Sequence, residues 1–140
     1  MKHKIMLIPV LLVAFLALPS CIVTSSLTSV EITCDEFTEN PHSISNEFQT
    51  EIGHKITVKL CSNPTTGFEW DYAMTIETVL KEEDHDFEEP GGDLAGAAGT
   101  EVWTFEAVEK GTTKVQMEYS QPWEGGMKEE WTYNMTVTVK

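Results

Sequence analysis

Apolar and polar residues alternate along much of the chain, which is the pattern of a β-strand with one buried face. Residues 131–139 show it most clearly, since every second residue there is large and apolar. The other strand candidates are 54–60, 68–74, 102–107 and 115–119, with weaker ones at 30–34 and 48–52.

Glycine and proline separate these strands, as at Gly53, Asn63-Pro64, Gly111 and Gly125-Gly126. No segment has the apolar periodicity of a long amphipathic helix. About seven short strands, each with one apolar face, need a second sheet to cover them. The pattern therefore predicts an all-β fold, an antiparallel β-sandwich of immunoglobulin-like type.

The first 20 residues have the pattern of an export signal. A cationic start, Met1–Lys4, precedes the apolar run Ile5–Leu18, which is too short to span a hydrocarbon core of about 30 Å as a helix. The ending Leu18-Pro19-Ser20-Cys21 resembles a prokaryotic lipoprotein box, in which the cysteine carries the lipid. We predict a signal peptide at 1–20, a lipidated Cys21, a tether at 21–29 and one domain at 30–140.

Pro19 departs from the small residue that is usual in such a box. Cleavage nearby without lipidation, and an uncleaved anchor, therefore stay open as alternatives. We expect the protein to be exported. It would then be a membrane-anchored lipoprotein at the cell surface or in the periplasm, or otherwise a secreted protein.

Charge narrows the range of partners. The 140 residues carry 9 basic and 23 acidic side chains, and the formal net charge is −14. Every acidic residue follows position 20, and arginine is absent. Phosphate backbones and anionic lipids are bound through Lys and Arg, so nucleic acid is excluded as a partner. We expect a monomer that meets a membrane only through a lipid on Cys21.

Cysteine and histidine offer little chemistry. Cys34 and Cys61 are either one disulfide or two buried thiols. Together with His54 they match no zinc spacing, and the acidic run 82–89 lacks the ligand pattern of a calcium loop, so we interpret it as a solvated loop. No serine or cysteine has the context of a nucleophile. We expect no metal, no cofactor and no enzymatic activity.

Three turn-rich segments stand out instead. In Asn63–Gly67, proline fixes φ and glycine permits a positive φ, so this loop should be stiff. Leu94–Thr100 has no bulky side chain after its leucine, so its backbone can approach another surface closely. Gln121–Gly126 places Trp123 at a loop tip, whereas Trp70 and Trp131 lie on strand faces and are expected in the core.

The order of these motifs resembles the chagasin family of cysteine-peptidase inhibitors. Asn-Pro-Thr-Thr-Gly-Phe-x-Trp, then Gly-x-x-Gly-Thr-Glu, then Pro-Trp carry the resemblance, which covers about residues 48–140. It implies an immunoglobulin-like sandwich whose three loops enter the cleft of a papain-like cysteine peptidase, with Thr65 nearest the catalytic cysteine and histidine. The implied contact residues are Asn63, Pro64, Thr65, Thr66, Gly67, Leu94, Gly96, Gly99, Thr100, Pro122 and Trp123.

One position departs from the family pattern. Where the family usually has arginine before Pro-Trp, this chain has Gln121, and the lost charge would weaken binding or change which peptidases are bound. The function expected from the whole sequence is reversible, non-covalent inhibition of papain-like cysteine peptidases. The alternative is an immunoglobulin-like adhesion or ligand-binding module at the cell surface.

Overall fold

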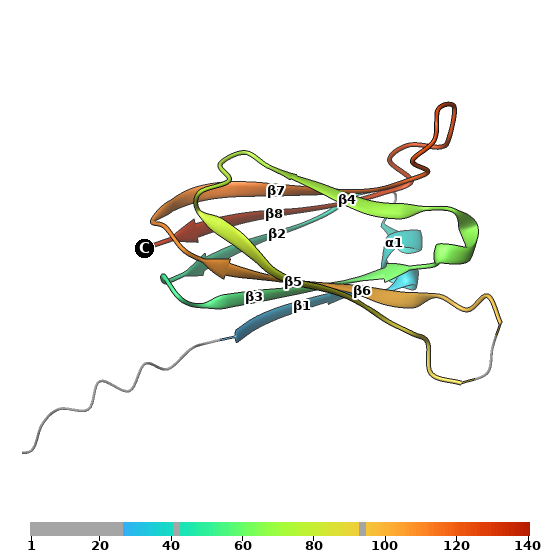
Figure 1. Ribbon diagram of the computed structural model, residues 1–140, viewed down its shortest axis with the longest axis horizontal. Coiled ribbons are helices and arrows are strands. Elements are labelled where there is room, and N and C mark those ends of the chain that lie inside the picture. Colours follow the sequence, from blue (N-terminus) through green and yellow to red (C-terminus); the bar gives the residue numbers. More distant parts are fainter. Residues whose placement is uncertain (1–26, 41–42, 93–94) are drawn as a thin grey trace, which may run out of the picture.

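The computed structural model describes residues 27–40, 43–92 and 95–140, which form two four-stranded sheets (Figure 1). The first sheet has the order β1-β3-β6-β5, with β1 at Leu27–Ile32, β3 at Lys55–Ser62, β6 at Gly99–Ala107 and β5 at Leu80–Glu88. The second has the order β2-β8-β7-β4, with β2 at Ser43–Thr50, β8 at Trp131–Val139, β7 at Gly111–Ser120 and β4 at Glu69–Met74. The helical segments are α1 at Cys34–Glu39 and the 3-10 turn η1 at Pro64–Thr66.

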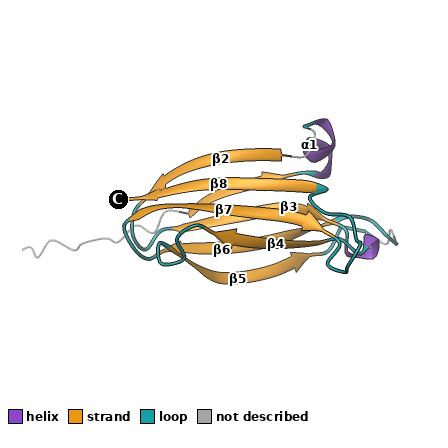
Figure 2. Ribbon diagram, turned by 90° about the horizontal axis from the view of Figure 1, so that it is seen from above, coloured by secondary structure: helices purple, strands orange, loops and turns teal. Residues whose placement is uncertain are grey.

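The two sheets pack face to face as layers (Figure 1), so that one sheet overlies the other when the sandwich is seen from above (Figure 2). The apolar faces predicted from the alternation form the core between them. In β3 the three apolar residues of the predicted face are fully buried, and the facing residues of β7 and β8 are equally inaccessible. Each such side chain contributes roughly 1.5–3 kcal/mol by leaving water. The core includes Ile56, Val58, Leu60, Val115, Met117, Tyr133, Met135 and Val137. The immunoglobulin-like sandwich is therefore confirmed.

One strand was not predicted. The acidic run, interpreted as a solvated loop, belongs to β5, which pairs antiparallel with β6 at the edge of its sheet. Two of its carboxylates form ion pairs with lysines of β3, since Lys59 Nζ lies 2.8 Å from Glu88 Oε1 and Lys55 pairs with Glu83. Charged side chains on an edge strand also discourage pairing with other chains. The loop interpretation was wrong because the pairing with β6, which makes this run a strand, has no local signature.

The N-terminal edge also differs from expectation. β1 starts at Leu27, so the last three residues of the predicted tether pair with the sheet, whereas residues 21–26 lie outside the described residues. β1 lies parallel to β3, and β2 lies parallel to β8, while the other four strand pairings are antiparallel. The sandwich is thus antiparallel except at two edges.

Helix α1 follows β1 and covers one end of the core. Thr33 and Glu36 form a capping box, in which the Thr33 N–H donates to Glu36 Oε2 at 2.8 Å and lowers the pKa of that carboxyl. Phe37 is buried and stacks on Trp131, with ring centroids 5.0 Å apart. Within the described residues, neither helical segment is long or apolar enough to cross a membrane.

A disulfide joins Cys34 in α1 to Cys61 at the end of β3, with the two Cα atoms 5.1 Å apart. The sequence left open whether these cysteines form a disulfide or remain two buried thiols, and in the structure they form the disulfide. Because Cys61 lies two residues before Asn63, the bridge ties α1 to the base of the first turn-rich segment.

Strand directions divide the connections between two ends of the sandwich (Figure 1). We define the loop end by four segments: 63–68, which follows β3; 89–92, which follows β5; 95–98, which precedes β6; and 121–130, which follows β7. The turn end consists of the short turns 51–54, 75–79 and 108–110. The three segments singled out in the sequence therefore share the loop end.

Candidate functional site

The first loop is closed by its own hydrogen bonds. Asn63 caps η1, because its Oδ1 accepts from Thr65 N at 3.2 Å and from Thr65 Oγ1 at 2.6 Å. The Asn63 carbonyl accepts from Thr66 N at 3.1 Å and from Thr66 Oγ1 at 2.6 Å. Gly67 ends the turn at φ 76°, in the left-handed region, and its N–H donates to Pro64 O. The predicted stiffness has this origin, and Thr65 is left exposed at the tip.

The base of this loop rests on Tyr119, near the end of β7. The Asn63 N–H donates to the Tyr119 hydroxyl at 2.8 Å. The ring of Tyr119 lies between two tryptophans, with centroids 5.0 Å from those of both Trp70 and Trp131. Trp70 in turn donates its indole N–H to Cys61 O at 2.9 Å. A buried aromatic cluster thus fixes where the loop leaves the sheet.

The second loop contacts the first. The side-chain amide of Asn63 donates to the Gly96 carbonyl at 3.0 Å, which joins the two loops directly. Gly96 has φ 79° and is exposed, and Leu94 lies outside the described residues.

Gly99 and Thr100 occupy a different setting from the one expected. They are the first residues of β6, paired with Ser62 and Cys61, rather than part of the open loop. A Cβ on Gly99 would collide with the Phe87 ring and the Glu88 carbonyl. The glycine is therefore needed for packing within the sandwich.

The third loop connects β7 to β8 and folds back on itself. Gln121 N donates to Met127 O at 2.8 Å, and Met127 N donates to the Gln121 side-chain oxygen at 3.0 Å. Gly126 N donates to Trp123 O at 3.1 Å. Pro122 is exposed, and Trp123 and Met127 are 50% and 55% exposed, so the loop presents two large apolar side chains to solvent.

Loops one and three touch through Gly67. A Cβ at that position would lie 2.6 Å from Cη2 of Trp123, so the indole packs directly over the glycine. Thr65, Gly96 and Trp123 are therefore held in one surface by contacts between the loops. This surface brings together Asn63, Pro64, Thr65, Thr66, Gly67, Gly96, Pro122 and Trp123 from the residues predicted for the site.

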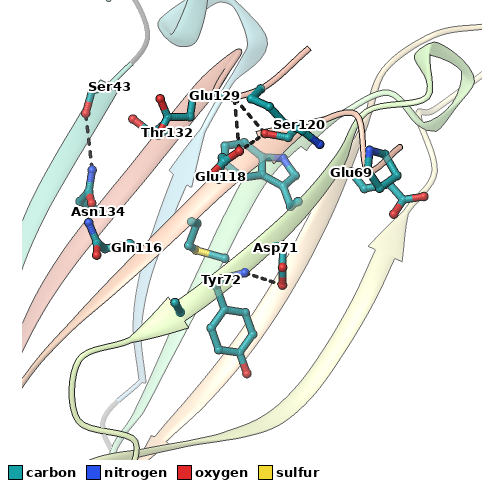
Figure 3. Close-up of a pocket in the computed structure, with 15 residues that line it drawn as sticks. Ser43, Glu69, Asp71, Tyr72, Gln116, Glu118, Ser120, Glu129, Thr132 and Asn134 are labelled. Carbon is teal, nitrogen blue, oxygen red and sulfur yellow. Dashed lines mark hydrogen bonds between the residues drawn. The ribbon is translucent and has the colours of Figure 1, made fainter. Parts of the chain in front are cut away.

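The base of the third loop is fixed on the outer face of β4, β7 and β8, where polar side chains line a shallow hollow of about 980 Å³ (Figure 3). Glu129 has φ 51°, and its N–H donates to Ser120 Oγ at 2.9 Å and to Glu118 Oε1 at 3.3 Å. On the same face, Asp71 Oδ1 accepts from Tyr72 N at 2.8 Å. The two bonds of Glu129 hold the return of the loop into β8.

Charged side chains near the loop end form contacts between strands of the first sheet. Glu101 on β6 accepts from Ser62 Oγ at 2.9 Å and lies 3.1 Å from Nε2 of His85, which stacks on Trp103 with centroids 4.4 Å apart. This cluster ties β3, β5 and β6 together below the second loop. Within the part of the chain that the structure describes, no three His, Cys, Asp or Glu side chains converge on a point that could hold a metal ion.

Sequence reasoning missed three contributions to this surface. The Tyr119 hydroxyl supports the first loop, yet the alternation of β7 identified Tyr119 only as a core residue. Gln121 was noted for its missing charge, whereas its side chain closes the third loop. Met127 follows the Gly125-Gly126 turn, and its exposure beside Trp123 was not foreseen. The contact between Asn63 and Tyr119 spans 56 residues, and such a distant contact leaves no sequence signal.

Comparison with known proteins agrees with this architecture. The family model described as the chagasin family of peptidase inhibitors matches residues 49–137. Chagasin of Trypanosoma cruzi is 32% identical over 78 residues, which are 53% of this chain and 71% of chagasin. The cysteine protease inhibitor EhICP2 of Entamoeba histolytica has the same fold, with a TM-score of 0.61 and 19% identity over 81% of this chain and 97% of that one. PbICP-C, solved in complex with falcipain-2, has a TM-score of 0.50 and 12% identity over 81% of this chain and 98% of that one.

Proposed function

This chain belongs to the chagasin family of peptidase inhibitors, and we propose that it is a reversible, non-covalent inhibitor of papain-like cysteine peptidases. The observation that carries the proposal is the surface formed by the three loops, in which Thr65 and Trp123 project from hydrogen-bonded turns. In this proposal the first loop enters the active-site cleft, and the second and third loops contact its two sides.

Rigidity supports tight binding by this surface. A loop that is flexible before binding loses entropy when it is ordered on its partner. Here the contacts from Asn63 to Gly96 and Tyr119, and from Gly67 to Trp123, order the loops when the chain folds. A standard interface buries about 800 Å² on each partner, with aromatic anchors near its centre. Trp123 is the exposed aromatic residue suited to that role.

The hydrogen bonding of the first loop supports a non-covalent mechanism. A cysteine peptidase cleaves a peptide after its thiolate attacks a carbonyl that is polarised by hydrogen-bond donors. The carbonyls of Asn63 and Pro64 already accept hydrogen bonds inside the 3-10 turn, so they are not presented to such donors. Thr65 then occupies the cleft and excludes water and substrate, and no acyl-enzyme forms through these two carbonyls.

The test is a titration of papain with the chain from residue 22 onward, which includes every element that the structure describes. We expect loss of activity to a stoichiometric endpoint, recovery of activity on dilution, and an uncleaved inhibitor by mass spectrometry. An adhesion or ligand-binding module, which similarity to peptidase inhibitors does not favour, would leave papain fully active.

Three variants locate the inhibitory surface. Thr65→Ala and Trp123→Ala should each weaken binding by about 2 kcal/mol and leave thermal stability nearly unchanged, because both side chains are exposed. Trp70→Ala is the structural control, since Trp70 is buried and its loss should cost about 3–5 kcal/mol of folding stability. A collapsed fold in Trp123→Ala, together with full inhibition by Thr65→Ala, would contradict the assignment.

We also propose that Cys21 carries the lipid that holds the inhibitor at a membrane. The apolar run before it and the serine at position 20 support this proposal, and the net charge of −14 argues against attachment by protein charge alone. Mass spectrometry of the native protein should find an N-terminal peptide that begins at Cys21 and carries a lipid mass. An unmodified N-terminus elsewhere would refute lipidation and leave the inhibitory function untouched.

A further inference from the structure

We propose that the turn end of the sandwich rests on the lipid bilayer, so that the three loops point away from it. The proposal goes beyond peptidase inhibition and rests on the anchoring at Cys21 proposed above. It follows from where the chain enters the sandwich, from the distribution of exposed apolar side chains, and from the distribution of charge.

The chain enters at the turn end. Leu27 begins β1 and pairs with Lys55, the first residue of β3, while the first loop follows the last residue of β3. Five residues lie between Cys21 and Leu27, and the six peptide steps that join them reach only about 20 Å even when fully extended. The eight residues of β3 alone extend about 26 Å. A lipid on Cys21 therefore cannot let the domain invert and place its loop end on the bilayer.

Exposed apolar side chains gather at the two ends. Of the six large apolar residues exposed in the described part of the chain, Trp123 and Met127 belong to the third loop. Three others lie in the turns of the turn end, where Ile52 is 50%, Ile76 47% and Val108 40% exposed, and Leu27, at the start of β1 beside them, is 66% exposed. The loop-end pair fits the proposed peptidase contact. The turn-end residues are remote from that contact, so they are available to another apolar surface.

The turns that carry these residues form one continuous surface. Gly53 N, next to Ile52, donates to Ala107 O at 2.7 Å, and Val108 N donates to Val79 O at 3.0 Å. The turn around Ile76 is tied to β7, because Ile76 O accepts from Thr113 Oγ1 at 2.9 Å. Figure 1 shows these turns together at the end where the C-terminus also lies. Three side chains held in this way can enter the interfacial region of a bilayer together.

Charge favours the same orientation. The three turns, the two strand residues next to each side of a turn, and the terminal lysine contain four lysines and four carboxylates; these residues are Lys55, Lys81, Lys110, Lys140, Glu51, Glu77, Glu106 and Glu109. The rest of the described chain has three lysines against eighteen carboxylates. An anionic membrane repels that acidic remainder and tolerates the balanced turn end. Lys110 and Lys140, both exposed, are also placed to meet lipid phosphates.

The experiment uses the full chain purified from membranes and reconstituted in vesicles of phosphatidylcholine with a minority of phosphatidylglycerol. Amide hydrogen exchange is compared between the vesicle-bound and the detergent-solubilised protein. We expect vesicles to slow exchange in 51–54, 75–79 and 108–110 at least threefold, and to leave 63–67 and 121–127 unchanged. Vesicle-bound protein should inhibit added papain as the solubilised protein does, because its loops face the solvent.

Variants separate apolar insertion from tethering alone. Ile52→Ser combined with Val108→Ser should lose the vesicle-dependent protection and still inhibit papain, since neither residue lies in the loops. Met127→Ser, an equally exposed apolar residue at the loop end, should keep the protection. Serine variants that fail to inhibit papain would be misfolded, and Ile76→Ser then replaces them.

Several results would overturn the proposal: protection of 63–67 or 121–127, protection of neither end, or failure of the full chain to associate with vesicles. Protection of the turn end that rises with protein concentration and persists in detergent would instead identify a second copy of the chain as the occupant. Loss of papain inhibition in both vesicles and detergent, with the turn end still protected, would refute the inhibitory function and leave the membrane contact standing.

Discussion

The amide N–H of Asn63 donates to the hydroxyl of Tyr119 at 2.8 Å, across a separation of 56 residues. Asn63 starts the first loop, and Tyr119 stands near the end of β7, just before the third loop. The tyrosine ring is stacked on Trp131 and in contact with Trp70, so the hydroxyl has a fixed position. One buried side chain thus sets the relative position of two loops, of which the first crosses between the sheets and the third joins two strands of the second sheet.

Tyr119→Phe should weaken papain inhibition about fivefold to tenfold and lower Tm by only a few degrees. The ring contacts persist, but the Asn63 N–H loses its acceptor, which is worth about 1 kcal/mol. Inhibition constants and thermal unfolding test this. Tyr133→Phe is the matched control, because it removes a buried hydroxyl in the core and should leave inhibition unchanged. Equal inhibition by all three proteins would show that the bond does not position the loop.

Gly67→Ala should weaken inhibition more than tenfold, because its Cβ would displace the Trp123 indole. Gly53→Ala is the control: Gly53 has φ 86°, close to the 76° of Gly67, but has open space around it and lies at the turn end. Each substitution should cost about 1 kcal/mol of stability through its left-handed backbone. Denaturant unfolding should therefore give similar losses, and papain titration should separate the two. Comparable inhibition by both variants would contradict the contact between the loops.

Gln121→Arg should bind papain-like peptidases more tightly than the parent at low salt and more weakly at high salt. The added charge is screened by salt, whereas the bond lost by Met127 N is not, since a guanidinium cannot accept a hydrogen bond. Gln121→Glu retains an acceptor and should keep the third loop closed. Inhibition constants of the parent and both variants, measured at low and high ionic strength, test this prediction. An arginine variant that binds more tightly than the parent at both would mean that the Met127 bond has no effect on binding.

Removal of the disulfide by Cys34→Ala with Cys61→Ala should lower the free energy of unfolding by about 3–4 kcal/mol. The bridge closes a loop with a sequence separation of 27 residues, and opening it restores entropy to the unfolded chain. Denaturant unfolding with and without reductant measures this. Reductant should destabilise the parent to the level of the double variant and leave the variant unaffected. A parent that is insensitive to a strong reductant under unfolding conditions would disprove the contribution of the bridge.

Tyr133→Phe should raise stability by about 1 kcal/mol at neutral pH, because the buried Tyr133 hydroxyl has no hydrogen-bond partner among the described residues. Burial raises the pKa of Tyr133 above its usual value near 10. The parent therefore loses stability as the pH rises above about 10, where the unfolded chain ionises first. Tm measured from neutral to alkaline pH should fall less steeply in the variant. The variant should still lose some stability at alkaline pH through Tyr72, because burial and the hydrogen bond to Glu82 raise the pKa of Tyr72 to about 12.

The sequence determined the features that depend on neighbouring residues. Alternation with period two identifies the buried faces of β3, β7 and β8, because adjacent side chains of a strand point to opposite sides. Proline, glycine and asparagine fix the backbone of the first loop within five residues, so its stiffness is predictable from Asn63–Gly67 alone. The order of the three loop motifs was sufficient to indicate the family.

Only the tertiary structure decided the features that depend on distant partners. β5 is a strand because it pairs with β6, and the cysteines are bonded because α1 folds against the end of β3. Gly99 is required by the Phe87 ring, and Gly67 by the Trp123 indole. The clustering of Ile52, Ile76 and Val108 at the end where the chain enters likewise follows from strand direction. Each of these contacts joins residues that are far apart along the chain, so its energy exists only once the sheets have paired.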